Sequence, residues 1–445
     1  MIPMVLQSLI TQSVAVADML MVGSLSEQYL ATIAVAMIPL FLFMIITFGI
    51  QNGAGILVAQ YWGRGDKDTI NRILGIALMS SIVVLLTGAL IIFFFAESIL
   101  SLLTSEMSLI PIAVPYVRVV AFSHLFGAVS MVYISFHRSM ENPKLGFIIL
   151  SISAILNLLS NWVLIFGRLG FPALGIQGAA FSTLGVRALE VIIISIYASR
   201  NKRLPLKLKL IFRPGISIFK DYLKLSLPVL LNEALWGVGF IAYPIILGHM
   251  SNAGAFLAAH NIAGNVERMF AVAVFACAGA TAVIIGRELG AGRKDNIESI
   301  AKSLITLALL LGLASATLLM IARFTLLERF VYPLFDLSRE ASSASTIMIT
   351  MLAFIIPLRT VGITTGLGIL RGGGDVKALM FIDLGSLYLV SLPIAITSGL
   401  VLGLGVGFVY AGFLFEDLVK TSLLLWRFKS RKWVRNLTRP REQFE

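Results

Sequence analysis

The sequence predicts an all-α integral membrane protein whose twelve transmembrane helices form two six-helix lobes. The first observation behind this prediction is composition: hydrophobic residues make up 58% of the chain and charged residues 13%, with a mean hydropathy of +0.94. A soluble domain carries about 25% charged residues, so lipid is the expected solvent. The second observation is a series of apolar runs of about 20 residues, the length that crosses a bilayer as a helix. The third is an internal repeat.

The apolar runs and the short polar segments between them divide the chain into twelve spans. No stretch of the sequence has the composition of a separate soluble domain, and the alternating pattern of a membrane barrel is absent. The expected spans cover residues 1–23, 29–60, 70–97, 109–137, 145–167, 175–199, 216–248, 254–286, 297–323, 343–370, 378–401 and 404–428.

The repeat relates the first half of the chain to the second. The segment AGILVAQYWGRGDKD at 54–68 corresponds to TAVIIGRELGAGRKD at 281–295, and Pro3 corresponds to Pro228 at an offset of 225 residues. Further short matches follow in the same order. Because six spans is an even number, both lobes have one orientation and are related by a parallel pseudo-two-fold repeat. The expected domains are an N-terminal lobe, a cytoplasmic linker, a C-terminal lobe and a basic cytoplasmic tail, at residues 1–199, 200–215, 216–428 and 429–445.

The distribution of Lys and Arg predicts the orientation in the membrane. Of the 35 basic residues, 26 lie in the tail and in or beside the loops after the even-numbered spans. Cytoplasmic loops carry such an excess, so we expect both termini in the cytoplasm and the protein in the cell membrane. The net charge of +12 then faces anionic membrane lipids. Its spread over six segments argues against a nucleic-acid partner.

Span 1 carries the first candidate site residue. Asp18 is ionisable and lies inside a span, which costs roughly 2.5–3.5 kcal/mol on insertion scales and needs a reason. Gln7 and Thr11 share a helical face with it, so this face is expected to line a cavity. Two interpretations stay open: Asp18 binds a coupling ion or proton, or it is hydrogen-bonded within its lobe without such a role.

Spans 5 and 6 add neutral oxygen atoms. Asn157 and Asn161 lie one turn apart on span 5, and Thr183 lies on span 6. Amide and hydroxyl oxygens are hard ligands, so with one carboxylate they suit Na⁺ or a proton. Hydrogen bonding between helices is the alternative role for the two asparagines.

Span 7 is the candidate substrate region. Asn232, Trp236 and Tyr243 fall on one helical face, and Glu233 lies beside them. A carboxylate next to aromatic rings can bind a lipophilic organic cation by charge pairing and cation–π contact. The alternative is a packed aromatic interface in which Glu233 is paired internally.

Span 10 carries a positive charge, Arg359, which we also assign to the substrate cavity. We expect it to pair with Glu233 or with the Glu267–Arg268 cluster. The histidines are scattered and Cys277 is the single cysteine, so no metal other than Na⁺ at the candidate site and no cofactor are expected. No catalytic pair of side chains stands out at helical spacing, so the chain is not expected to be an enzyme.

Five motifs occur in a characteristic order: ADMLMVGSLS, GILVAQYWGRG, LNLLSNWVLIFG, VIIGRELGAGR and LRGGGDVKALMFIDL. Together they resemble the MATE (multidrug and toxic compound extrusion) family, in its bacterial branch, within the wider multidrug/oligosaccharidyl-lipid/polysaccharide flippase superfamily. The resemblance implies two lobes around a central cavity and the export of organic, cationic drugs in exchange for Na⁺ or H⁺ by alternating access. It also implies a cation site that corresponds here to Asp18, Asn157, Asn161 and Thr183. Some members have Asp where this chain has Asn161, and this difference weakens a proton relay between two acids.

The alternative function is a flippase for lipid-linked saccharides, which would need a strongly cationic cavity. The expected protein is a monomeric, ion-coupled efflux transporter. A basic segment precedes Pro228 but not Pro3, so we also expect either that the natural chain begins upstream of residue 1 or that the first lobe has lost this segment.

Overall fold

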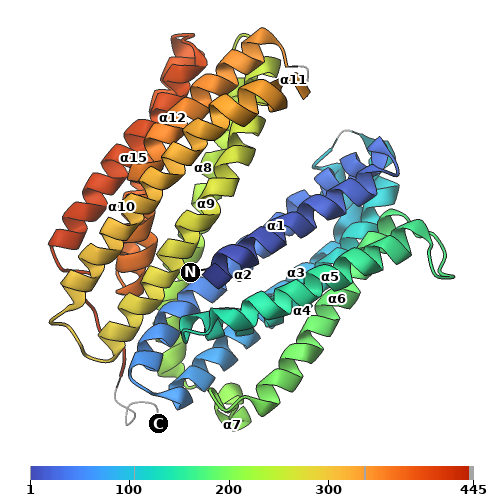
Figure 1. The fold of residues 1–445 in the computed structure, drawn as a ribbon. Helices are drawn as coiled ribbons and strands as arrows, with labels where there is room; N and C mark the ends of the chain where they lie inside the picture. Colours follow the sequence, from blue (N-terminus) through green and yellow to red (C-terminus); the bar gives the residue numbers. More distant parts are fainter. Residues whose placement is uncertain (1, 105, 335–336, 440–445) are drawn as a thin grey trace. The chain divides into compact units, whose positions relative to one another are not determined.

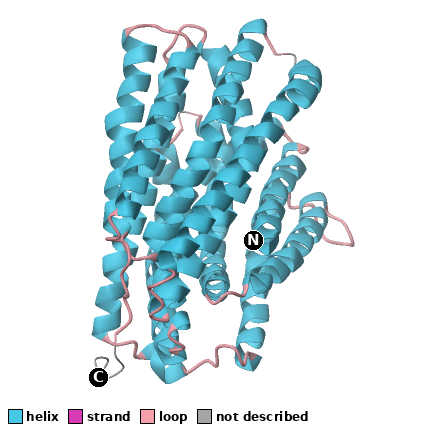
Figure 2. Ribbon diagram, turned by 60° about the vertical axis from the view of Figure 1, so that its left-hand side comes forward, coloured by secondary structure: helices cyan, strands magenta, loops and turns pink. Residues whose placement is uncertain are grey.

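The computed structural model describes residues 2–104, 106–334 and 337–439. Within these residues the chain consists of helices and loops without a strand (Figure 2). Eleven of the described helices are long and apolar enough to cross a membrane. A twelfth, α15 (Val406–Lys429), carries Glu416, Asp417 and Lys420 along its length, and all three are buried among neighbouring helices. The predicted all-α membrane fold is therefore confirmed.

The chain divides into two compact units, residues 2–230 with 439 and residues 231–438. The lobe limits taken from the sequence repeat, at 1–199 and 216–428, stay a prediction. Figure 1 labels the long helices of the first unit, which are α1 (Ile2–Gly23), α2 (Glu27–Gly63), α3 (Lys67–Ser101), α4 (Ile110–Ser139, after the 3₁₀ turn Met107–Leu109), α5 (Pro143–Phe166) and α6 (Ile176–Arg200). The short α7 (Leu208–Phe212) lies in the predicted linker.

Helix α8 (Ile216–Gly248) contributes its residues up to 230 to the first unit and the remainder to the second. The second unit also contains α9 (Ala253–Gly290), α10 (Ile297–Ala322), α12 (Arg339–Ile363), α13 (Val376–Ser386) and α15, with the short α11 (Tyr332–Leu334) and α14 (Leu392–Ile396). Four π-helical segments continue these helices at Arg323–Val331, Thr364–Leu370, Leu387–Ser391 and Thr397–Val401. A π-helical turn has more residues than an α-helical one, so each segment changes the face on which later residues lie.

Polar residues fix the starts of several helices. The side chain of Ser26 accepts a hydrogen bond from the amide of Tyr29 at 3.1 Å, and Asp66 accepts one from the amide of Thr69 at 3.2 Å. Each satisfies an amide that has no partner in the first turn of its helix. These caps explain why α2 and α3 begin within a few residues of the predicted spans.

Helices α2 and α9 end in turns of the same type. The amides of the three residues after Gly63 donate to the carbonyl oxygens four, three and five residues before them, and so do those after Gly290. Gly65 and Gly292 both have a φ angle of +77°, a left-handed conformation that glycine adopts without steric cost. The sequence repeat is thus a repeat of local structure, since each copy places glycine where the turn needs it.

A second turn also occurs in both halves. The amides of residues 140–142, after α4, and of residues 373–375, after the π-helical segment Thr364–Leu370, again donate four, three and five residues back. Gly374 has a φ angle of +83°, whereas the corresponding residue of the first half is Glu141, with a φ angle of +61°. A side chain at this position is strained, because left-handed backbone brings Cβ close to a carbonyl oxygen.

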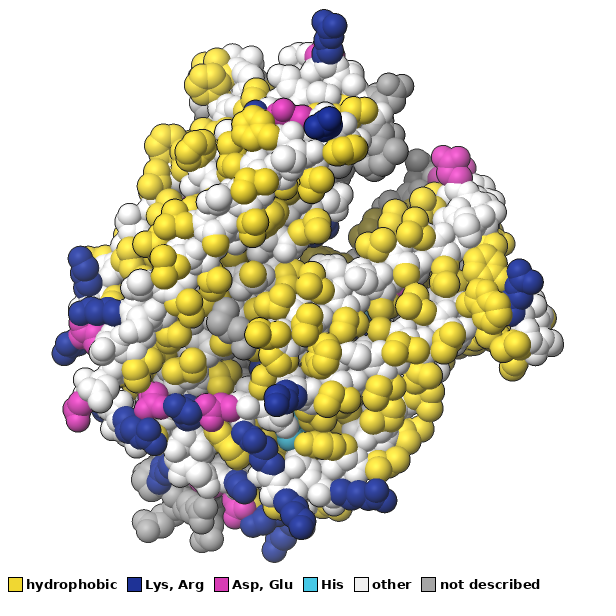
Figure 3. All heavy atoms as spheres, viewed as in Figure 1, with side chains coloured by type: hydrophobic (Ala, Val, Ile, Leu, Met, Phe, Trp, Pro, Cys, Tyr) yellow, Lys and Arg dark blue, Asp and Glu magenta, His cyan; other side chains and the backbone are white. Residues whose placement is uncertain are grey.

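Each unit has its own apolar interior and an apolar outer surface. Val22, Leu40 and Leu85 are buried between helices of the first unit, and Met348, Leu352 and Val409 between helices of the second. Hydrophobic side chains also cover the long faces of both units, while Lys and Arg gather mainly near one end of each (Figure 3). This distribution suits helices surrounded by lipid with basic residues at an interface.

The basic tail predicted from residue 429 onward is folded along most of its described length. Trp433 is 1% exposed, stacks on Phe428 with ring centres 5.6 Å apart, and donates from Nε1 to the Phe428 carbonyl oxygen at 3.0 Å. Arg435 pairs with the buried Asp375 at 2.9 Å. The tail is therefore part of the second unit's packing and not only a run of solvated charge.

Candidate functional site

The first unit brings three of the predicted site residues together. Helix α1 carries Asp18, and α5 carries Asn157 and Asn161 one turn apart. The Nδ2 atom of Asn161 donates to a carboxylate oxygen of Asp18 at 2.6 Å and lies 3.3 Å from Oδ1 of Asn157. Asn157 is 6% exposed and Asn161 is fully buried. A single amide nitrogen thus holds the carboxylate and the second amide in place.

The cluster has oxygen atoms available for a cation. The Oδ1 atom of Asn161 is buried and has no hydrogen-bond partner, which is costly unless a ligand or water uses it. The carboxylate of Asp18 and the amide oxygens of Asn157 and Asn161 are hard donors of the type that small cations prefer. This set of donors fits one monovalent cation or a proton.

The fourth predicted residue, Thr183 of α6, is not joined to this cluster. Among the described residues, no hydrogen bond connects Thr183 to Asp18 or to either asparagine. Its neighbour Ser182 takes that place: its hydroxyl lies 2.5 Å from the hydroxyl of Ser160 and 3.4 Å from the carbonyl oxygen of Asn157. Neither serine was predicted from the sequence, although each directly precedes a predicted site residue.

Gln7 and Thr11 continue the polar face of α1. The Thr11 hydroxyl donates to the carbonyl oxygen of Gln7 at 3.0 Å, and the Thr11 side chain is exposed. The side-chain oxygen of Gln7 lies against Gly146 of α5, only 2.9 Å from where a Cβ atom would stand. Gly146 therefore lets α1 and α5 approach closely at Gln7, on the N-terminal side of Asp18.

A positive charge lies near this site. Arg187 of α6 binds both carboxylate oxygens of the buried Glu190, at 2.9 and 3.0 Å. Arg187 also interacts electrostatically with Asp18. Because Glu190 accepts both of these hydrogen bonds, Arg187 is a weaker counter-charge for Asp18 than for Glu190.

In the second unit, two predicted substrate residues are held by polar partners. The side chain of Glu233 pairs with Arg371 at 2.9 Å. The Nδ2 atom of Asn232 donates to Asp383 at 3.1 Å, and Asn232 is 3% exposed. The internal pairing of Glu233 that the sequence left open is thus present, with Arg371 as its partner.

The predicted aromatic residues of α8 have different surroundings. Trp236 is 38% exposed and stacks on Phe240, with ring centres 5.3 Å apart. Tyr243 is fully buried, stacks on Phe413 and shares a hydrogen bond with Ser391 at 2.7 Å. Of the two predicted aromatic residues, Trp236 therefore offers an exposed ring surface together with Phe240, and Tyr243 does not.

Arg359 of α12 joins two acidic side chains. It pairs with Glu267 of α9, one of the partners expected from the sequence, and with Asp417 of α15 at 2.7 Å. Its guanidinium carbon also lies 5.7 Å from the ring centre of Phe413. Glu233, the other expected partner, is bound to Arg371 instead.

A family model described as MatE matches residues 3–163 and 228–397 of the chain. The chain belongs to the MatE family. The two matches begin 225 residues apart, the offset that relates Pro3 to Pro228 in the sequence repeat. Each half of this MatE protein therefore carries one copy of the family's repeating unit.

Curated relatives match this chain over nearly its whole length. The NorM protein of Rhizobium meliloti, named a probable multidrug resistance protein, is 27% identical and is matched over 96% of this chain and 91% of its own. The YisQ protein of Bacillus subtilis, named an uncharacterized transporter, is 23% identical over 94% of this chain and 90% of its own. The predicted resemblance to MATE multidrug efflux transporters is confirmed, and the MatE proteins are transporters rather than enzymes.

Solved MATE structures share the fold. A multidrug resistance MATE family transporter in an outward-facing conformation has a TM-score of 0.85 at 19% identity, covering 97% of this chain and 95% of the other. A mutant of the Vibrio cholerae MATE transporter VcmN has a TM-score of 0.83 at 18% identity, covering 98% and 96%. With the apolar helices, these matches make the MatE chain a multi-pass membrane protein.

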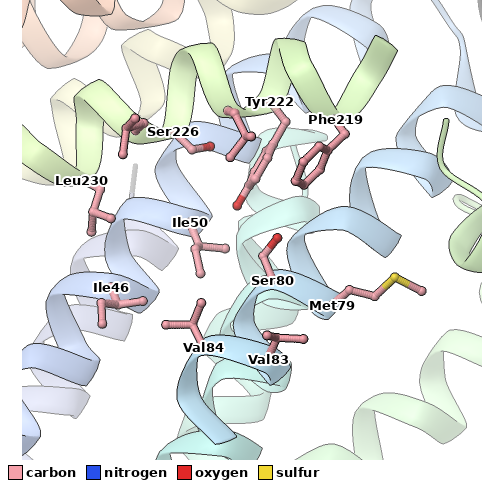
Figure 4. Close-up of a pocket in the computed structure, with 12 residues that line it drawn as sticks. Ile46, Ile50, Met79, Ser80, Val83, Val84, Phe219, Tyr222, Ser226 and Leu230 are labelled. Carbon is pink, nitrogen blue, oxygen red and sulfur yellow. The ribbon is translucent and has the colours of Figure 1, made fainter. Parts of the chain in front are cut away.

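The first unit of this MatE protein also contains an apolar cavity of about 530 Å³ between α2, α3 and the first part of α8. Figure 4 shows Ile50, Val84 and Leu230 pointing into it, with the hydroxyls of Ser80, Tyr222 and Ser226 as its polar atoms. No charged side chain lines it. The cavity therefore fits apolar groups, and it is separate from the Asp18 cluster.

Proposed function

We propose that this MatE protein exports organic cations across the plasma membrane in exchange for Na⁺ or H⁺, by alternating access. Asp18 is the coupling group, with Asn157 and Asn161 as its oxygen-bearing partners. The observation that carries the proposal is the 2.6 Å hydrogen bond from Asn161 to Asp18, next to a buried amide oxygen that has no partner. A carboxylate in a membrane helix costs free energy, so its presence there points to a functional role.

Coupling requires that ion and drug exclude each other. A cation or proton at Asp18 neutralises the carboxylate and removes the need for the Asn161 hydrogen bond that ties α1 to α5. A drug cation then loses its electrostatic attraction to Asp18. By linkage, the drug must lower ion affinity by the factor by which the ion lowers drug affinity.

For the substrate, the exposed Trp236–Phe240 stack supports a lipophilic cation, since aromatic faces attract positive charge. Glu233 can add charge pairing only if the drug cation competes with Arg371 for its carboxylate. The flippase alternative gains no support from this arrangement. It would need a strongly cationic cavity, whereas the first-unit site is built around a carboxylate.

The test is flux of a labelled organic cation in proteoliposomes, under separate Na⁺ and pH gradients, for the wild type and Asp18→Asn. The substitution keeps the size of the side chain and removes its switchable charge. We expect gradient-driven export to be lost while drug binding to the purified protein persists.

Glu97→Gln is the matched control, because Glu97 is an exposed acid on α3 and takes no part in the cluster. It should export at the wild-type rate. Wild-type export by Asp18→Asn under the same gradient would show that Asp18 is only structural, and the coupling site would have to lie elsewhere.

A further inference from the structure

The second unit encloses an ammonium group in a cage of carboxylates. The Nζ atom of Lys420 lies 3.0 Å from Glu416, 3.2 Å from Asp383 and 3.8 Å from Asp417. Glu416 and Asp417 belong to α15, as Lys420 does, and Asp383 belongs to α13. The cage thus joins two helices around one positive charge.

The cage lies well inside the membrane-spanning part of α15. Lys420 is nine residues from the helix end at Lys429, which corresponds to about 14 Å along the axis. Lys420 is 8% exposed, Glu416 4% and Asp417 fully buried. Charges at this depth are stable only when they are paired, so the lysine and the acids depend on one another.

The cage is richer in acceptors than Lys420 alone can satisfy. Asp417 uses one oxygen to bind Arg359, while its other oxygen is buried without a hydrogen-bond partner. Asn232 donates to Asp383, and its own Oδ1 atom is likewise buried and without a partner. These unsatisfied oxygens are what a small cation would coordinate if the ammonium were not there.

We propose that Lys420 is a tethered cation that permanently fills a cation cage made by Asp383, Glu416 and Asp417. The cage then holds no exchangeable ion, and a metal cation can enter it only when the lysine is removed. Resting on the function proposed above, this means that ion exchange during transport does not use this cage.

The experiment measures thermal stability of the purified protein in detergent, with NaCl compared against choline chloride. All variants carry Asp18→Asn, so that the first-unit site does not contribute. We expect the Asp18→Asn protein to melt at one temperature in both salts. Adding Lys420→Met removes the ammonium and keeps an apolar side chain of similar length. This double variant should melt at a lower temperature in choline and regain several degrees as Na⁺ is raised to saturation.

Two controls isolate the charge of Lys420. Lys420→Arg, which keeps a cation in the cage, should show no response to Na⁺. Lys377→Met removes an exposed lysine of α13 and should show none either. If the Asp18→Asn protein already responds to Na⁺, the cage takes metal ions beside Lys420 and the proposal is wrong. The proposal is also wrong if the Lys420→Met double variant is stabilised by lower pH but not by Na⁺, or by neither Na⁺ nor lower pH.

Lys420→Met could also prevent folding. In that case Asp383→Asn and Glu416→Gln are added to it, which removes two of the negative charges left unpaired. Recovery of the folded protein supports the electrostatic role of Lys420, and continued misfolding contradicts it. The experiment measures stability and not transport. The proposal for Lys420 can therefore fail while the proposal for Asp18 holds, and the proposal for Asp18 can fail while that for Lys420 holds.

Discussion

The amide nitrogen of Asn161 lies 2.6 Å from a carboxylate oxygen of Asp18, although the two residues are 143 positions apart in the sequence. Helices α1 and α5 are thereby joined by a charge-assisted hydrogen bond, which is stronger than a neutral one. The bond fixes the carboxylate in one orientation, with the free oxygen of Asn161 beside it. A cation bound at Asp18 would therefore meet a preformed set of oxygens.

Asn161→Ala should weaken cation coupling without abolishing it. The substitution removes the buried Oδ1 atom of Asn161, a proposed ligand of the cation. Loss of one polar contact to a charged group, roughly 1.5–3 kcal/mol, corresponds to a 10- to 150-fold loss of cation affinity. The measurement is the ion concentration at half-maximal export in proteoliposomes. Asn52→Ala is the control, because the Asn52 amide bonds only to a carbonyl oxygen of its own helix. An unchanged ion requirement in Asn161→Ala would exclude Asn161 from the site.

Asn161→Asp should change the pH dependence of export. It places a second carboxylate beside Asp18, and two neighbouring carboxylates tend to share a proton because like charges repel. The midpoint of the pH profile should therefore move to higher pH than in the wild type. A profile that coincides with the wild-type curve would indicate that residue 161 does not face Asp18 during transport.

The helices and the repeat could be predicted from sequence because their signals are local or periodic. Apolar runs fix the spans, and the glycines at 65 and 292 mark turns that only a few residues can form. The ion pairs of Lys420 with Glu416 and Asp417 are equally local, since these residues lie four and three positions apart on one helix.

Partners on different helices could not be predicted in the same way. Periodicity gives the face on which a residue lies, but the pairing depends on how far neighbouring helices are shifted and rotated. Arg371 follows the π-helical segment Thr364–Leu370, so its direction differs from that of a regular helix, and its pairing with Glu233 was not foreseen. Asp383 and Lys420 lie on different helices, so their ion pair could not be predicted from periodicity either.

Because the turns after α2 and α9 have the same geometry, we expect equal losses of stability from two substitutions. Gly65→Ala and Gly292→Ala should each destabilise the protein by about 1–2 kcal/mol, because the left-handed backbone strains any side chain. An added Cβ meets no atom within 4 Å at either position, so backbone strain is the sole cost. Melting of purified protein tests this. Gly185→Ala, on α6 with equally open space and ordinary backbone, should not destabilise it; similar losses in all three would rule out a conformational cause.

The corresponding turn after α4 predicts a stabilising change. Glu141 has a φ angle of +61° where the second half of the chain has Gly374. Glu141→Gly should relieve this strain and raise the melting temperature, by an amount equivalent to about 1 kcal/mol. Glu106→Gly, at an exposed acid with negative φ, is the control and should not stabilise the protein. A lower melting temperature for Glu141→Gly would mean that the Glu141 side chain contributes more than its backbone costs.

The distribution of basic residues predicts on which side each loop lies. In a Cys277→Ala background, a cysteine at Pro205, in the segment between α6 and α7, should react with an impermeant thiol reagent only from the cytoplasmic side. A cysteine at Arg168, in the loop between α5 and α6, should react only from outside. Both positions are exposed, so access to the reagent is limited by the membrane and not by packing. Labelling of position 205 in intact cells would reverse the assignment of both termini, because an even number of spans places them on one side.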